Sequence, residues 1–89
     1  MGKVRELAKA GQNLRARRLR LGLTLGDVYR ASLTLARELG NPAFILPASR
    51  VQQIEARDFV PSIHRLYALS HVYKCRLREL LSWYGIPSH

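Results

Sequence analysis

The chain has 89 residues, which fits a single domain and leaves no room for a second hydrophobic core. Hydrophobic residues make up 47% and aromatic residues 8%, so we expect a compact, mainly aliphatic core rather than a disordered chain. Fifteen Lys and Arg against six Asp and Glu give a net charge of +9, which favours a polyanionic partner, either nucleic acid or an anionic lipid surface.

The first predicted helix covers residues 3–21, and Gly22 supplies its stop. Apolar residues recur along it at helical spacing, namely Leu7, Ala10, Leu14 and Leu21. Seven of the fifteen basic residues lie in the first twenty positions: Lys3, Arg5, Lys9, Arg15, Arg17, Arg18 and Arg20. Gly11 interrupts the pattern, so we expect residues 1–10 to be a basic N-terminal extension of this helix and residues 11–85 to form the domain.

A second helix is expected to begin after Thr24, because Thr24 and Asp27 match a capping box with Asp in place of Glu. Gly40, followed by Pro42, marks its end. Its core side should carry Val28, Ser32, Leu35, Ala36 and Leu39. The connection that follows contains three apolar residues, Phe44, Ile45 and Leu46, and we expect it to be packed against the domain.

The third predicted helix begins at Pro47, which suits a first helical turn, and continues through Glu55. At about 100° per residue, Val51 and Ile54 share one side of it. The opposite side carries Ser49, Gln53 and Ala56, with Gln52 at the border. Short amide and hydroxyl side chains on an exposed helix can read base edges in the DNA major groove. The alternative is that they only keep a surface helix soluble.

Two further helices complete an all-α fold. Ser62 follows Pro61 and is placed to cap the fourth helix. The side facing the core should carry Ile63, Leu66, Leu69 and Tyr73. The fifth helix begins near Leu77 and runs to Gly85, and residues 86–89 form a C-terminal tail.

Five short motifs occur in a fixed order along the chain. They are Gly11-x-x-Leu14-Arg15-x-x-Arg18, Gly22-Leu23-Thr24-Leu25-x-x-Val28, Val51-x-x-Ile54-Glu55, Pro61-Ser62-x-x-x-Leu66 and Leu77-x-x-Leu80-Leu81. Together they resemble the lambda-repressor/Cro-like helix-turn-helix family, also called the XRE family, over residues 11–84. The resemblance implies a compact five-helix DNA-binding domain whose third helix enters the major groove.

The resemblance also assigns roles to individual positions. It implies base reading by Ala48, Ser49, Gln52 and Gln53. The Thr24 helix start is expected to hold a phosphate, as are three arginines: Arg15, Arg50 and Arg57. Arg18 and Glu55 match an ion pair that joins the first and third helices in many members, and we assign this pair to architecture.

One departure from the family pattern is the extended connection between the second and third helices. The stretch of residues 33–46 is about a dozen residues longer than the matching stretch in common members of the family. We hypothesise that about two turns are added to the second helix and that the segment from Pro42 to Pro47 folds back. Alternatively, this insertion is a partner contact, because Phe44, Ile45 and Leu46 are apolar.

We therefore expect sequence-specific binding of double-stranded DNA by a bacterial transcriptional regulator, cytoplasmic and nucleoid-associated, acting as a homodimer. A dimer or partner patch would contain Trp83, Tyr84, Ile86 and Phe44. One alternative is a protein-interaction adaptor that keeps the fold without reading DNA. Another is a peripheral membrane protein whose basic helix at residues 3–21 lies on anionic lipid, although that helix lacks Trp and Phe on its apolar side.

Catalysis and metal binding are not expected. The sequence shows no nucleophile with an adjacent base, no glycine-rich phosphate loop and no paired carboxylates. We therefore do not expect an enzyme, and we expect no cofactor and no small-molecule substrate. His64, His71 and Cys75 could align on a long helix, but solvent-facing histidines and a core cysteine explain them better. Cys75 is the only cysteine, which favours a reducing compartment. No apolar run reaches the roughly 18 residues of a membrane span.

Overall fold

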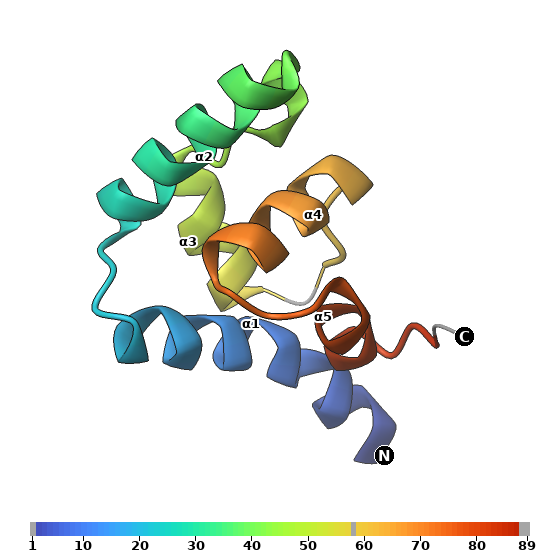
Figure 1. Ribbon diagram of the computed structural model, residues 1–89. Coiled ribbons are helices and arrows are strands. Elements are labelled where there is room, and N and C mark those ends of the chain that lie inside the picture. The colour runs from blue at the N-terminus through green and yellow to red at the C-terminus, as the bar shows by residue number, and fades with distance from the viewer. Residues whose placement is uncertain (1, 58, 88–89) are drawn as a thin grey trace.

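The helices follow one another in the order that the sequence predicts. The computed structural model describes residues 2–57 and 59–87, with side chains from residue 10 onward. Its elements are α1 (Gly2–Arg20), α2 (Leu25–Leu39), the 3-10 turn η1 (Pro42–Phe44), α3 (Ala48–Ala56), α4 (Ile63–Val72) and α5 (Leu77–Trp83) (Figure 1). The described residues thus form helices joined by turns and loops, with no strand, as the predicted all-α class requires. Residues 88 and 89 of the expected tail lie outside it.

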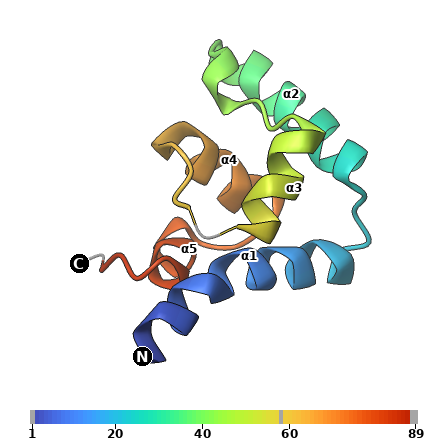
Figure 2. The same ribbon diagram turned by 180° about the vertical axis from the view of Figure 1, so that it is seen from behind.

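The five helices enclose one core. α1 runs beneath α3 and also contacts α5, while α2 packs on α3 and α4 (Figure 1). Seen from behind, α3 lies on the near side of the molecule, above α1 and below α2 (Figure 2). The radius of gyration is 12.5 Å, close to about 12 Å for a folded chain of this length. The largest fully buried side chains are Tyr73, Leu14, Leu46, Ile54, Leu69, Leu80, Val28 and Val51.

The predicted helix boundaries are confirmed by their capping contacts. Thr24 Oγ1 accepts a hydrogen bond from the Asp27 amide at 3.0 Å, and the Asp27 carboxylate accepts one from the Thr24 amide at 2.8 Å. Gly40 closes α2 with a φ of 64°, in the left-handed region that glycine adopts at little cost. Ser62 Oγ accepts from the Arg65 amide at the start of α4.

Several expectations about helix faces were wrong. Leu39 is 48% exposed, because the C-terminal end of α2 projects past α4 (Figure 1). Ile63 is 60% exposed, since it stands at the edge of the buried side of α4, beside the exposed Tyr67.

Two expectations about where helices break or begin also differ from the structure. Gly11 does not divide the first helix, which continues through it. Pro47 precedes the first helical residue, Ala48, rather than lying within the first turn.

The long connection between α2 and α3 folds back onto the domain. Leu46 is completely buried. Its amide donates to Ser32 Oγ at 2.8 Å, and the same hydroxyl donates to the Tyr29 carbonyl at 2.7 Å. Phe44 is half-buried, with its ring edge-on to His64 at a centroid distance of 5.1 Å. The connection is therefore packed down as expected, and Ser32 fixes where α3 begins.

Candidate nucleic-acid interface

The face of α3 opposite the core is free of other elements. Val51, Ile54 and Glu55 are buried on its inner side. Ser49, Gln52 and Gln53 are all exposed, and the neighbouring connection does not cover them. Ala48 is half-buried, so it offers less surface than the other three predicted base-reading positions. Two glutamine amides and a serine hydroxyl are thus presented to solvent along one short helix.

A close backbone contact sets the distance between α1 and α3. A Cβ atom built on Gly11 would lie 2.5 Å from the carbonyl oxygen of Glu55 and 2.9 Å from that of Ile54. Only glycine fits there without movement of a helix, since nonbonded carbon and oxygen atoms do not approach so closely. The apparent break in the helix pattern is therefore the point where α3 rests on α1.

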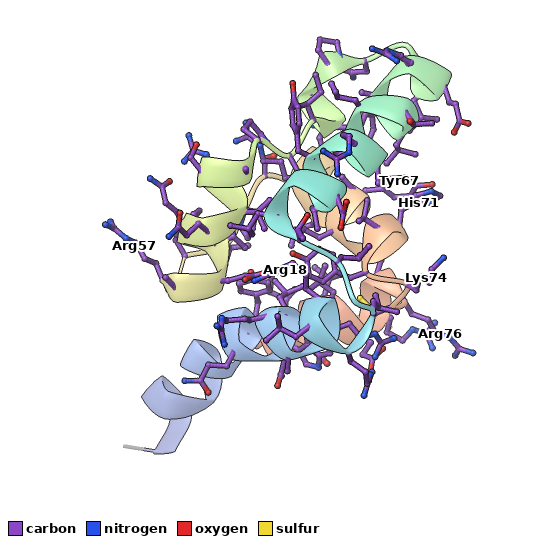
Figure 3. All side chains as sticks on the ribbon, turned by 90° about the vertical axis from the view of Figure 1, so that its left-hand side faces the viewer. Arg18, Arg57, Tyr67, His71, Lys74 and Arg76 are labelled. Atoms are coloured by element: carbon purple, nitrogen blue, oxygen red, sulfur yellow. The ribbon has the colours of Figure 1, made fainter. Side chains whose placement is uncertain are left out.

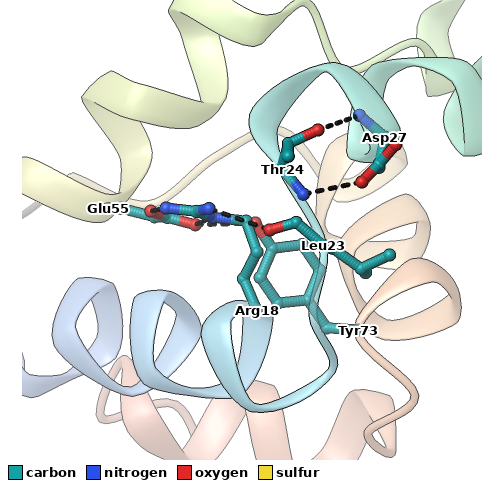
Figure 4. A network of polar contacts seen from close by, with 6 residues as sticks. All are labelled: Arg18, Leu23, Thr24, Asp27, Glu55 and Tyr73. Carbon is teal, nitrogen blue, oxygen red and sulfur yellow. Dashed lines mark hydrogen bonds and ion pairs between the residues drawn. The ribbon is translucent and has the colours of Figure 1, made fainter.

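A buried polar network joins α1, α3 and α4 (Figure 4). Arg18 Nε and Nη2 donate to the two carboxylate oxygens of Glu55 at 2.9 and 3.0 Å, as a bidentate pair. The Tyr73 hydroxyl donates to Glu55 Oε2 at 2.8 Å. The Arg18 and Glu55 side chains are only 10% and 5% exposed. This geometry fixes the orientation of α3 against the core.

The network also shifts the acidity of its members. The hydrogen bond to Glu55 raises the pKa of Arg18 above its usual value, although burial opposes the shift. Burial raises the pKa of Tyr73, and the negative charge of Glu55 adds to this effect. Arg18 Nη1 donates a third hydrogen bond, to the Leu23 carbonyl at 3.0 Å. The charge of Arg18 is thus matched inside the protein and is not presented to a ligand.

Two of the predicted phosphate-binding arginines lie near the C-terminal half of α3. Arg15 of α1 and Gln52 of α3 line the same hollow of about 340 Å³, at the junction with the start of α2. Arg57 is exposed at the C-terminal end of α3 and extends away from the protein (Figure 3). Arg15 therefore lies beside Gln52, and Arg57 directly follows the last turn of α3.

Arg50, the third predicted arginine, lies on α3 itself. It is exposed, and its Nη1 lies 3.4 Å from Gln53 Oε1. A residue predicted to bind phosphate and a residue predicted to read bases are therefore neighbours, and a long hydrogen bond joins their side chains.

The start of α2 is less suited to phosphate than expected. The Thr24 amide and Oγ1 are both engaged with Asp27, which leaves the hydroxyl hydrogen to donate. The amide hydrogen bond from Thr24 is the main cause of a lowered pKa at Asp27. That carboxylate is therefore charged at neutral pH and opposes an anion near Thr24, although Arg30 forms an ion pair with it.

The expected dimer or partner patch does not form as one surface. Tyr84 is only 6% exposed, and Trp83 and Ile86 are half-buried against the core. Phe44 lies in η1, which packs on α2 and α4, whereas α5 packs on α1 and α4. The two parts stand at opposite ends of the molecule (Figure 1). Helical spacing could not reveal this separation, because it depends on which helices η1 and α5 pack against.

Sequence reasoning assigned no separate role to Arg17. Its Nε donates to the Tyr73 carbonyl at 3.0 Å and its Nη2 to the Lys74 carbonyl at 2.7 Å. These carbonyls end α4, where backbone acceptors lack helical partners. Arg17 therefore ties the end of α1 to the end of α4. Nothing in the local sequence indicates this contact, since the two segments are more than fifty residues apart.

His64, His71 and Cys75 are the residues whose types could bind a metal. Among the side chains of residues 10–57 and 59–87, no group of three His, Cys, Asp or Glu is placed to hold a metal ion. His71 is exposed, and Cys75 is half-buried beside the core. Burial raises the pKa of the Cys75 thiol, which disfavours its reactive thiolate form.

Comparison of the chain with protein-family models, with curated proteins and with solved structures finds no match. In the part of the chain that the structure describes, no helix has the length and apolar character needed to cross a bilayer.

Proposed function

We propose that this protein is a lambda-repressor-like helix-turn-helix domain that binds double-stranded DNA in a sequence-specific manner and regulates transcription. In this proposal α3 enters the major groove. Ser49, Gln52 and Gln53 contact base edges, and Arg15, Arg50 and Arg57 contact phosphates.

The observation that supports this proposal most is the exposed polar face of α3 together with its rigid mounting. Amides and hydroxyls specify bases only if they are held at a fixed depth and angle. The Gly11 contact and the Arg18–Glu55–Tyr73 network hold α3 in this way.

The first experiment is selection of bound sequences from random duplex DNA. We expect enrichment of one short motif. An inverted repeat with centres about 34 Å apart would indicate binding as a two-fold dimer. An interaction adaptor that does not read DNA would enrich nothing, and that result would refute the proposal.

Two variants then separate base reading from phosphate binding. Gln53→Ala should lower affinity for the selected site by about 1 to 3 kcal/mol and relax preference at one position. Arg15→Ala should weaken selected and random duplexes alike. Arg37→Ala is the control, because Arg37 is exposed in α2 and lines a separate hollow with Leu33 and Pro42 rather than the hollow of Arg15 and Gln52. Wild-type binding by both test variants would contradict the assigned roles.

Liposome flotation tests the membrane alternative. We expect the protein to stay in the bottom fraction both with and without anionic lipid. Flotation that requires anionic lipid, together with no enriched DNA motif, would favour the lipid surface over the major groove.

A further inference from the structure

A second cluster of basic side chains lies where the end of α1 meets the connection between α4 and α5. We call it the α1/α5 surface, and it comprises Arg17, Arg20, Lys74, Arg76 and Trp83. Arg17 binds the carbonyls of Tyr73 and Lys74 and so holds its parts together. Arg20 and Trp83 line a hollow of about 220 Å³ with Arg17 and Asn13.

The cations of this surface form no ion pair with any carboxylate whose side chain the structure describes. Among the residues that the structure describes, no carboxylate lies within 4.0 Å of a cationic group of Arg17, Arg20, Lys74 or Arg76. Arg18 and Arg30, in contrast, are paired with Glu55 and Asp27. Two acids lie in neighbouring positions, Glu79 in the first turn of α5 and Glu38 beside the same hollow as Lys74. The surface therefore remains positive overall.

This surface points away from the α3 face. Arg57, at the end of α3, and Lys74 and Arg76 extend from opposite sides of the molecule (Figure 3). Arg15 and Arg20 also lie on different sides of α1, because Arg15 lines the hollow beside α3 whereas Arg20 lines the hollow beside α5. A duplex bound by α3 would therefore leave the α1/α5 surface uncovered.

We propose that the α1/α5 surface binds the phosphate backbone of a second DNA duplex, so that one domain holds two DNA segments at once. This inference rests on the proposed function of α3. Backbone contacts need only well-placed Arg and Lys donors and carry no sequence information. A protein partner would instead need an apolar centre, and Trp83, the one aromatic residue of the set, is half covered by the core.

The test is a bridging assay. One duplex with the selected site is fixed to beads, and a fluorescent duplex of unrelated sequence is added with the protein. We expect the wild-type protein to retain the fluorescent duplex. The double variant Arg20→Glu/Arg76→Glu should retain at least about tenfold less, because it loses two phosphate contacts and gains repulsion. Its occupancy of the fixed site should change far less.

Both substitutions are at exposed positions, and Lys74 is left intact because its φ of 55° is in the left-handed region. Circular dichroism should show wild-type melting for the variant. Arg37→Glu is the control, since it reverses an exposed charge outside both surfaces, and it should bridge like the wild type.

Four results have a defined meaning. Bridging by the double variant at the wild-type level would overturn the inference, as would a wild-type protein that selects its site but does not bridge. In a further arm, a fluorescent polyglutamate peptide replaces the second duplex. If the wild-type protein retains this peptide but not DNA, and the double variant does not retain the peptide, the assignment to nucleic acid would be overturned. Failure to select any sequence would refute the function of α3. In that case a random duplex that binds the wild type but not the double variant would still support the second surface.

Discussion

Ser32 shows how one small buried side chain positions an entire helix. Its hydroxyl accepts the Leu46 amide and donates to the Tyr29 carbonyl. In Ser32→Ala the Leu46 amide would remain buried without a partner, so we expect a loss of about 1 to 3 kcal/mol in the free energy of unfolding. Urea denaturation measures this change.

Ser70→Ala is the matched control. The Ser70 hydroxyl is also buried and donates to the Tyr67 carbonyl three residues earlier, but no amide of the described residues donates to that hydroxyl. The Ser70 variant should therefore lose clearly less stability than the Ser32 variant. Equal losses would show that Ser32 does not anchor the connection to α3.

Tyr84 presents the opposite case, a buried hydroxyl without a hydrogen-bond partner among the residues that the structure describes. Leaving such a group unpaired costs free energy. Tyr84→Phe should therefore be at least as stable as the wild type at pH 7. Tyr73→Phe is the contrasting variant and should be less stable, because it loses the hydrogen bond to Glu55.

Tyr84 also predicts a dependence on alkaline pH. Burial raises its pKa from 10.0 to about 12. The unfolded chain therefore releases this proton first, and the free energy of unfolding falls as the pH rises from about 10 toward 12. Tyr84→Phe should reduce that fall without abolishing it, because the pKa of Tyr73 is raised as well. Urea titrations at pH 7, 10 and 11 would test this, and an unchanged pH dependence would contradict the assignment.

At the scale of elements, two glycines in helices have opposite significance. Gly11→Ala would force α1 and α3 apart, since the new Cβ would meet the Glu55 carbonyl at 2.5 Å. We expect a loss of about 1 to 3 kcal/mol. Gly26→Ala in α2 meets no atom nearer than 3.4 Å, at the flexible end of Arg30, and should stabilise by about 0.5 to 1 kcal/mol. Thermal melting of the two variants shows whether each substitution lowers or raises the melting temperature. Destabilisation by both substitutions would contradict the close-contact explanation.

The ends of the elements were largely predictable because local chemistry determines them. The capping box at Thr24 and Asp27, the left-handed Gly40 and the Ser62 cap each satisfy backbone groups within a few residues. The exposure of apolar side chains near the ends of helices was not predictable in the same way. Leu39 and Ile63 stand near the buried arcs of their helices, and whether a neighbouring helix covers them depends on its length and position.

At the scale of the whole molecule, the proposed DNA contacts predict a defined salt dependence. With Arg15, Arg50 and Arg57 on phosphates, log affinity should fall with log salt concentration by a slope of about −0.9 per contact. Arg15→Ala should make this slope shallower by about 0.9, whereas Arg37→Ala should leave it unchanged. Fluorescence anisotropy with a short duplex between about 50 and 200 mM salt measures both. A wild-type slope in Arg15→Ala would exclude that residue from phosphate binding.

Periodicity, caps and glycine stops act over a few residues, and they were enough to predict the order of the helices, the polar outer side of α3 and the packed connection before it. Three features could be seen only once the chain was folded: Gly11 is a contact point rather than a break, Tyr84 is buried and remote from Phe44, and Arg15 and Arg20 line hollows on different sides of α1. Each of these depends on which distant segment packs against the residue, and local patterning carries no information about that distance or direction.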